Sequence, residues 1–250
     1  MPENQLMPQN LSRTSLTRDA LLSQANGLLD TVLDFKGMMM EYSCAMREIQ
    51  TKLEILGTEF AVKQSRNPIS SIHTRLKSQT SIMEKMSRLH IPITRQNIEE
   101  NLFDIAGLRV ICAYIDDIYL IADALSARDD ITVIQKKDYI QNPKPNGYRS
   151  LHLIVSIPVY FSDHVKNINA EIQIRTIAMD FWASLEHGIK YKKNAPDAEK
   201  IIKGLKECAD VIAVTDERMM ELRKQMDQTV SSRSETEAIY EKLKRFDVPF

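Results

Sequence analysis

Four short segments in the middle of the chain have the composition of β-strands, and segments with helical periodicity lie between and around them. Each is rich in β-branched and apolar residues and is bounded by turn-forming residues. These segments are Leu108–Tyr114, Ile131–Ile140, Ser150–Tyr160 and Ala170–Thr176. Apolar residues recur at helical spacing in Asp117–Ser126 and Ile177–Lys192. Because strands that alternate with helices form layered structures, we expect an α/β or α+β fold with one central sheet flanked by helices.

Long helical patterns flank this region on both sides. Apolar residues recur at helical spacing from Ser15 to Phe60, and Gly27, Gly37 and Gly57 are candidate positions for a break. The stretch from Ala198 to Met226 is amphipathic as well, and we expect it to pack on the core or on another subunit. The sequence thus predicts four parts: a disordered N-terminus (1–14), an N-terminal helical region (15–64), a core (65–193) and a C-terminal helical region (194–250).

The stretch Asn67–Arg88 leads from the N-terminal helix toward the sheet and is basic. An Asn-Pro pair opens it, and Ser81-x-x-Glu84 has the form of a capping box. We therefore predict two helices with a break near residues 78–80. Two helices that meet at an angle could direct four cations of this stretch to one point. These cations are Arg75, Lys77, Lys85 and Arg88.

The charge and hydropathy of the chain limit its partners. The formal net charge of −1 gives no global footprint for nucleic acid, so any site for a polyanion must be local. No apolar run approaches the roughly 18 residues that a membrane helix needs, and the first ten residues do not resemble a secretory signal. We expect a cytoplasmic protein that does not enter the membrane.

A turn-rich basic loop runs into the third predicted strand. Asn146 and Gly147 supply the turn, and Tyr148 supplies a flat ring. Three neighbours, Lys144, Arg149 and His152, are donors for phosphate or sugar oxygens. Loops held by strands often carry functional groups. A hairpin turn with an edge tyrosine explains the same residues equally well on local chemistry.

Two carboxylates lie beside predicted strands. Asp104 precedes the first strand, and the last strand places Glu171, Gln173 and Arg175 on one face. If that face lines a cleft, the two carboxylates could hold Mg²⁺ together with substrate phosphates. Alternatively, Asp104 caps a turn, and Glu171 forms a solvated ion pair with Arg175. The chain has no P-loop, no GxGxxG motif and no kinase motif, so arginine and lysine side chains would have to neutralise any bound triphosphate.

The order of these motifs resembles the synthetase domain of the alarmone synthetase family, and most closely its small, single-domain members. The resemblance covers roughly residues 65–193. Its motifs are Ser71 to Lys77, Asp104 to Arg109, Asp138 to Lys144, Asn146 to His152, Glu171 to Thr176 and Ala178 to His187. It implies a mixed sheet like that of nucleotidyltransferases and a homo-oligomer, commonly a tetramer, built through flanking helices. The core would then be the catalytic domain.

The resemblance also implies a reaction, in which the β,γ-pyrophosphoryl group of ATP moves to the 3′-hydroxyl of GDP or GTP with the help of Mg²⁺. The products are AMP and ppGpp or pppGpp, the alarmones of the stringent response. The long relatives carry a hydrolase domain with a His-Asp metal motif, which this sequence lacks. We expect synthesis without hydrolysis.

Individual roles follow from the same resemblance. Arg75, Lys77, Lys85 and Arg88 would hold the ATP phosphates, and Arg109 would stack on adenine. Asp104 would be the main Mg²⁺ ligand, and Glu171 either a second ligand or the base that takes the 3′-hydroxyl proton. Tyr148 would stack on guanine through its ring, without a part for its hydroxyl. The acceptor nucleotide would lie near Lys144, Asn146, His152, Gln173 and Arg175.

Two other classes of function explain parts of the sequence. An RNA-binding or regulatory module could use the basic loops for phosphates and Tyr148 for stacking on single-stranded bases, although the near-neutral net charge counts against it. RNA could also act as a regulator of an enzyme. A helical structural protein with a vestigial fold would have no use for the intact set of charged residues.

Overall fold

The structure is a computed structural model that describes residues 18–64, 66–190 and 198–231. The chain divides after Met38 into two compact units, and the second unit, from Met39 onward, contains the sheet and all helices except the beginning of the first. The segment predicted to be disordered, residues 1–14, lies outside the described residues. In the described part of the chain, no helix is both long and apolar enough to cross a bilayer.

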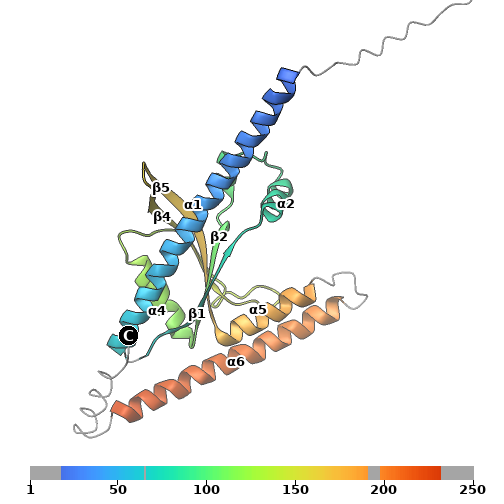
Figure 1. Cartoon of the computed structure of the whole chain (residues 1–250). Coiled ribbons are helices and arrows are strands. Elements are labelled where there is room, and N and C mark those ends of the chain that lie inside the picture. Colours follow the sequence, from blue (N-terminus) through green and yellow to red (C-terminus); the bar gives the residue numbers. More distant parts are fainter. Residues whose placement is uncertain (1–17, 65, 191–197, 232–250) are drawn as a thin grey trace, which may run out of the picture. The chain divides into compact units, whose positions relative to one another are not determined.

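A mixed five-stranded sheet forms the centre of the second unit (Figure 1), with the strand order β1-β2-β5-β4-β3. Only β2 and β5 pair in parallel, and the other neighbours are antiparallel. The strands are β1 (Ile69–Leu76), β2 (Ala106–Cys112), β3 (Thr132–Asp138), β4 (Leu151–Tyr160) and β5 (Val165–Thr176). The predicted mixed sheet is confirmed, and β2 to β5 occupy the four segments predicted as strands. Strand β5 begins at Val165, five residues before the segment predicted from Ala170.

Six helices accompany the sheet in the described part of the chain: α1 (Arg18–Gln64), α2 (Gln79–Leu89), α3 (Arg95–Asn101), α4 (Ile115–Ser126), α5 (Ile177–Lys190) and α6 (Ala198–Ser231). Alternate residues of β5 such as Ile172 and Ile174 are fully buried. Ile118 and Ile121 of α4 and Ile49 of α1 are buried to the same degree. One face of the sheet therefore belongs to the apolar core, which leaves the opposite face free for polar side chains.

The prediction of a helix at Asn67 is wrong, because this stretch forms the edge strand β1. The Asn67 side chain accepts a hydrogen bond from the Ile69 amide at 2.8 Å, which turns the chain into the strand. β1 then pairs along its length with β2, a long-range contact that local spacing does not reveal. The next helix, α2, is capped by Ser78, whose Oγ lies 3.3 Å from the Ser81 amide, and not by the predicted box at Ser81.

None of the three candidate glycines breaks the N-terminal helix, since α1 runs without interruption from Arg18 to Gln64. A single glycine in a helix costs only about 1 kcal/mol relative to alanine, which the neighbouring turns of a long helix can tolerate. Helix α3, which begins after the capping residue Thr94, was not among the predicted elements. The predicted domain boundaries stay predictions.

Helix α6 packs against α5 and the loop before β4, so of the two expected partners, the core or another subunit, the structure shows contact with the core. Trp182 of α5 donates from Nε1 to the Leu205 carbonyl at 2.8 Å, and Arg149 donates to the Ala209 carbonyl at 3.0 Å. Gly147 adopts a positive φ of 88°, and a Cβ added there would lie 2.4 Å from the Ala209 side chain. Only glycine therefore allows the loop to lie this close to α6.

Candidate active site

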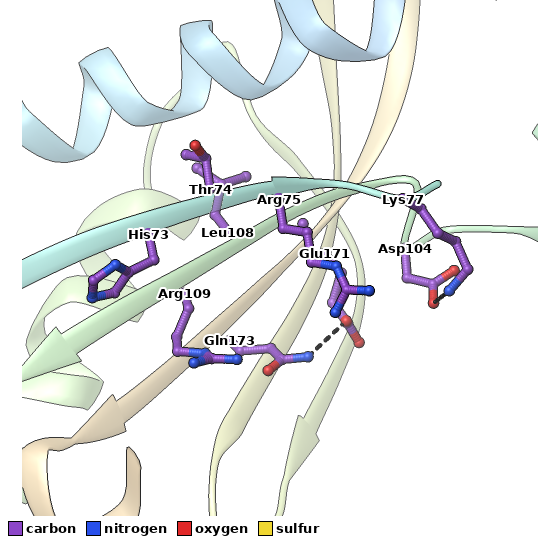
Figure 2. Close-up of a pocket in the computed structure, with 10 residues that line it drawn as sticks. His73, Thr74, Arg75, Lys77, Asp104, Leu108, Arg109, Glu171 and Gln173 are labelled. Carbon is purple, nitrogen blue, oxygen red and sulfur yellow. Dashed lines mark hydrogen bonds and ion pairs between the residues drawn. The ribbon is translucent and has the colours of Figure 1, made fainter. Parts of the chain in front are cut away.

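A cleft of about 400 Å³ opens on the polar face of the sheet, over the adjacent strands β1, β2 and β5 (Figure 2). Pairing aligns Arg75, Gly107 and Glu171 in one row across these strands. The next row holds His73, Arg109 and Gln173. The cleft is lined by His73, Thr74, Arg75, Lys77, Asp104, Gly107, Leu108, Arg109, Glu171 and Gln173. The sheet thus brings together residues that are about 100 positions apart in the chain.

Gly107 forms the floor of the cleft between the arginine of β1 and the glutamate of β5. Because it has no side chain, the space between Arg75 and Glu171 stays open. A Cβ at this position would lie 3.3 Å from the Arg75 carbonyl oxygen, which is tighter than ordinary packing. A glycine inside a strand commonly marks a place where a ligand comes close to the backbone.

Asp104 lies at one end of the cleft and is bonded to two lysines. Lys77 donates to Oδ2 and Lys85 donates to Oδ1, each at 2.8 Å. Burial raises the pKa of Asp104, but the hydrogen bonds from Lys77 and Lys85 outweigh it, so the pKa lies below its ordinary value. The carboxylate is ionised at neutral pH, and two ammonium groups are held beside it.

The other predicted ATP-binding cations are less tightly held. Arg75 lines the cleft and is exposed, and its guanidinium has no hydrogen-bond or ion-pair partner among the described residues. Arg88 is exposed on α2, one turn after Lys85, and is not among the residues that line the cleft. Arg109 lines the cleft, and its Nη1 lies 3.2 Å from Asp180 Oδ1. Four of the five predicted cations therefore lie at or beside the cleft.

Glu171 has a hydrogen-bond partner on each oxygen. Gln173 Nε2 donates to Oε2 at 2.9 Å, and His152 Nδ1 lies 3.1 Å from Oε1. Burial raises the pKa of Glu171, but the bonds to His152 and Gln173 outweigh it, and the pKa is lowered. Asp104 acts in the opposite direction and raises this pKa, so the two carboxylates are close enough to repel each other.

Tyr148 stands beside Glu171 on the loop before β4. Its Oη lies 2.8 Å from His152 Nε2 and accepts from Arg175 Nη2 at 2.7 Å. Lys144 Nζ lies 4.7 Å from the centre of the Tyr148 ring. Asn146 is held by Glu186 of α5, to which its amide donates at 3.0 Å. The hydroxyl, to which the sequence assigned no part, is a member of the hydrogen-bond network.

Arg175 differs from the other predicted acceptor contacts in being almost completely buried, with 4% of its surface exposed. Besides Tyr148 it donates to Gln173 Oε1 at 2.6 Å, to Asp180 Oδ1 at 3.2 Å and, from Nε, to Ser150 Oγ at 3.4 Å. Its guanidinium is therefore committed to side chains of the protein.

Two residues of this network were not singled out for a role by the sequence. Asp180 lies near Nη1 of both Arg109 and Arg175, at 3.2 Å in each case. Its place in the first turn of the helix that follows β5 was the available signal. Tyr139 packs edge-on against Tyr148, with ring centres 6.0 Å apart, and lies under the Lys144 ammonium. The sequence around Tyr139, at the polar end of β3, contains no local pattern that indicates its contact with Tyr148.

The donor set fits Mg²⁺. In the described part of the chain, no three histidine, cysteine or acidic residues cluster as they would for a metal held by protein alone. Asp104 and Glu171 instead provide two ionised carboxylates at one cleft with cations around them. Mg²⁺ commonly binds through one or two carboxylates and completes its shell with substrate phosphates and water.

Comparison with known proteins gives consistent results. Residues 74–196 match the family described as a region found in RelA / SpoT proteins. GTP pyrophosphokinase YwaC of Bacillus subtilis (strain 168) is 42% identical over 209 residues, which are 84% of this chain and 100% of that protein. Small alarmone synthetase 1 from Bacillus subtilis, solved bound to its product pppGpp, is 37% identical with a TM-score of 0.70, covering 78% of this chain and 98% of that one. The same enzyme bound to AMPCPP is 34% identical with a TM-score of 0.66 and covers 78% and 98%.

Proposed function

Since the chain belongs to the RelA/SpoT family and, within it, to the small alarmone synthetases, we propose that it is a GTP pyrophosphokinase. It transfers the β,γ-pyrophosphoryl group of ATP to the 3′-hydroxyl of GDP or GTP and produces ppGpp or pppGpp and AMP. The proposal covers synthesis alone, without hydrolysis of the product, in the response to stress and starvation. The observation that carries it is the cleft in which Asp104 and Glu171 face a group of cations.

The donor nucleotide binds on the side of β1, α2 and β2. Arg75, Lys77, Lys85 and Arg88 neutralise its phosphates, and Arg109 stacks on adenine. Support comes from the exposed guanidinium of Arg75 in the cleft and from the two lysines at Asp104. A triphosphate carries several negative charges, so this number of cations is appropriate where no P-loop is present.

The acceptor nucleotide binds on the opposite side, at the loop before β4. The Tyr148 ring stacks on guanine. The other residues of this pocket contact the nucleotide or hold a residue that does, and they are Lys144, Asn146, His152, Gln173 and Arg175. Glu171 lies between the two sides, because its strand pairs with β2 on one edge and with β4 on the other. A 3′-hydroxyl at Glu171 would therefore face the ATP phosphates.

In the reaction, the 3′-oxygen of the acceptor forms a bond to the β-phosphorus of ATP. The bond from that phosphorus to the oxygen of the α-phosphate breaks, and AMP leaves with the electron pair. The hydroxyl proton passes to a base, for which Glu171 is the candidate carboxylate. The protein contributes mainly by aligning the two nucleotides and by compensating charge on the migrating phosphates.

Asp104, with Glu171 as the second carboxylate, would hold Mg²⁺ in this site. When bound, the metal would place its positive charge beside the phosphate oxygens and stabilise the negative charge that develops on them during the transfer. Lys77 and Lys85 keep Asp104 ionised and oriented before any metal arrives. Once the carboxylate has another cation to bind, the two ammonium groups can turn to the ATP phosphates.

The chain is further proposed to act in the cytoplasm as a homo-oligomer, with a tetramer as the expected state. Support comes from apolar side chains that lie exposed on the helices after the sheet. Phe181 of α5 is 61% exposed, and Val211 and Val214 of α6 are each 67% exposed. Exposed apolar patches on soluble proteins commonly mark contacts between chains.

A product assay without RNA tests the function. Purified chain given ATP, GDP or GTP and Mg²⁺ should release AMP and the matching alarmone in equal amounts. GMP as a third acceptor would define how many acceptor phosphates are required. If no AMP formed, the binding or regulatory module would become the better explanation of Tyr148 and the basic loop. If AMP formed only after RNA was added, RNA would be a regulator of the enzyme.

Tyr148→Ala should reduce kcat/KM for the acceptor by about tenfold to a hundredfold, since stacking of a base on an aromatic ring is worth roughly 1–3 kcal/mol. KM for ATP should stay unchanged, because the donor is bound by other residues. Tyr148→Phe keeps the ring and removes only the hydroxyl that contacts Arg175 and His152, so it should retain acceptor KM and lose part of kcat. Equal damage by Tyr148→Ala to the use of ATP and of the acceptor would contradict the assignment of this loop to guanine.

A further inference from the structure

We propose that Arg175 is a positioning residue. It begins two series of hydrogen bonds between side chains, each of which ends on one oxygen of Glu171, and it acts on the reaction by setting which group donates and which accepts along each series. The proposal deepens the proposed function and rests on it for the role of Glu171. It differs from a contact between Arg175 and the acceptor nucleotide, which the resemblance to relatives implies.

The first series runs through Tyr148 and His152. A guanidinium can only donate hydrogen bonds, so the Tyr148 hydroxyl is the acceptor of the bond from Arg175 Nη2. The single proton of the hydroxyl is then free for His152 Nε2, 2.8 Å away. A neutral ring that accepts at Nε2 carries its proton on Nδ1. That proton points at Glu171 Oε1, 3.1 Å away.

The second series runs through Gln173. The same nitrogen of Arg175 donates to the amide oxygen of Gln173 at 2.6 Å. This bond leaves the amide nitrogen on the other side, where it donates to Glu171 Oε2 at 2.9 Å. The carboxylate can only accept, so both ends of this series favour the same orientation of the amide, and without a donor at position 175 only the carboxylate would hold it.

Burial of Arg175 and His152 favours this single arrangement of hydrogen bonds over the alternatives. Arg175 is 4% exposed and His152 is 7% exposed, so water has little access to either group and an unpaired donor or acceptor is costly. Asp180 holds the far nitrogen of Arg175 at 3.2 Å. Each oxygen of the Glu171 carboxylate therefore accepts one hydrogen bond from the protein and keeps a lone pair for a ligand in the cleft.

The reactive side of Glu171 is thus set before substrate binds, whether the group serves as base or as metal ligand. Outer partners that orient a ligand of this kind usually affect activity by tenfold to a hundredfold. Arg175→Met should therefore lower kcat about tenfold to a hundredfold, while KM for ATP and for the acceptor stays unchanged. Arg175→Lys keeps the charge but cannot form the forked contact to Tyr148 and Gln173, so it should lose an intermediate part of kcat.

A second readout does not depend on activity. In the full chain labelled with ¹⁵N-histidine, the ring nitrogen shifts report which nitrogen of His152 carries the proton. A His152→Gln spectrum assigns the signal among the five histidines. The native chain should show His152 protonated at Nδ1. Because the ionised Glu171 carboxylate only accepts, it keeps the proton on Nδ1 in every variant. Tyr148→Phe and Arg175→Met should instead change the Nε2 shift of His152, because the hydrogen bond from the Tyr148 hydroxyl is lost or weakened. Tyr148→Phe leaves the buried charge of Arg175 in place if the methionine variant folds poorly.

Arg223→Met is the matched control. Arg223 of α6 also lies over a tyrosine ring, 5.1 Å from the centre of Tyr114, and pairs with Asp116 away from the cleft. Its loss should affect stability without changing kcat or the His152 Nε2 shift. Two results would overturn the proposal: a raised acceptor KM with unchanged kcat in Arg175→Met, or a His152 Nε2 shift that stays native in Arg175→Met. If the native chain made no alarmone, the proposed function would fail, and the Nε2 shift would still decide whether Arg175 orients the Tyr148 hydroxyl.

Discussion

Asp104→Asn should fold normally and lose synthesis by about a thousandfold or more at millimolar Mg²⁺. An amide keeps the shape of the side chain but cannot supply the negative charge that Mg²⁺ requires. Charge stabilisation by a bound metal is worth several kcal/mol, and about 4 kcal/mol corresponds to roughly a thousandfold in rate. The amide nitrogen would also face one of the two lysines that now donate to the carboxylate. Initial rates of AMP release over a Mg²⁺ series measure the effect.

Asp130→Asn provides the control for Asp104. Asp130 also accepts from two cations, Lys52 at 2.8 Å and Arg128 at 2.9 Å, but it lies outside the cleft. Ion pairs of this exposure contribute about 1 kcal/mol or less to stability, so both variants should melt within a few degrees of the native chain. Only Asp104→Asn should lose activity. Near-native turnover of that variant would remove Asp104 from the metal site.

Glu171→Gln should lower kcat by at least about a hundredfold, and its Mg²⁺ dependence separates two roles. If Glu171 is the base, the loss persists at saturating Mg²⁺, because an amide cannot take the hydroxyl proton, and general bases typically contribute a hundredfold to ten-thousandfold. If Glu171 is a metal ligand, raised Mg²⁺ restores part of the rate. In either case the amide nitrogen would oppose a donor, from His152 or from Gln173.

Glu41→Gln tests whether such a loss arises merely from disturbing a buried carboxylate. Glu41 is 8% exposed and accepts from Arg95 and from Lys166 in a network away from the cleft. We expect reduced thermal stability with native kcat for this variant. If Glu41→Gln and Glu171→Gln lost similar activity, the effect at Glu171 would have to be assigned to folding.

Local patterns were sufficient to predict four of the five strands and, together with the family resemblance, six of the residues that line the cleft. Period-two alternation in β5 placed Glu171, Gln173 and Arg175 on one face, and the structure has them there. The same reasoning failed for β1, because its identity as a strand depends on pairing with β2, about 35 residues later. It could also not decide whether Gly27 and Gly37 interrupt the helix, since the cost of one glycine is small in a helix as long as α1.

The contacts within the site depended on information that spacing does not contain. Lys85 of helix α2 reaches Asp104 in the loop before β2, and Arg175 turns away from solvent toward Tyr148 and Asp180. A strand pattern defines the face on which a side chain lies, but not which of several polar neighbours it bonds. The burial of Arg175 was therefore visible only in the folded chain.

The parallel pairing of β2 with β5 has a consequence for how the enzyme comes into being. The two strands join segments about 60 residues apart, and such non-local contacts form late and slowly because a long loop must close first. Asp104 and Glu171 lie on opposite sides of that loop. During synthesis on the ribosome the nascent chain therefore holds no assembled pair of carboxylates until β5 has emerged and taken its place between β2 and β4, so the proposed metal site cannot form before that point.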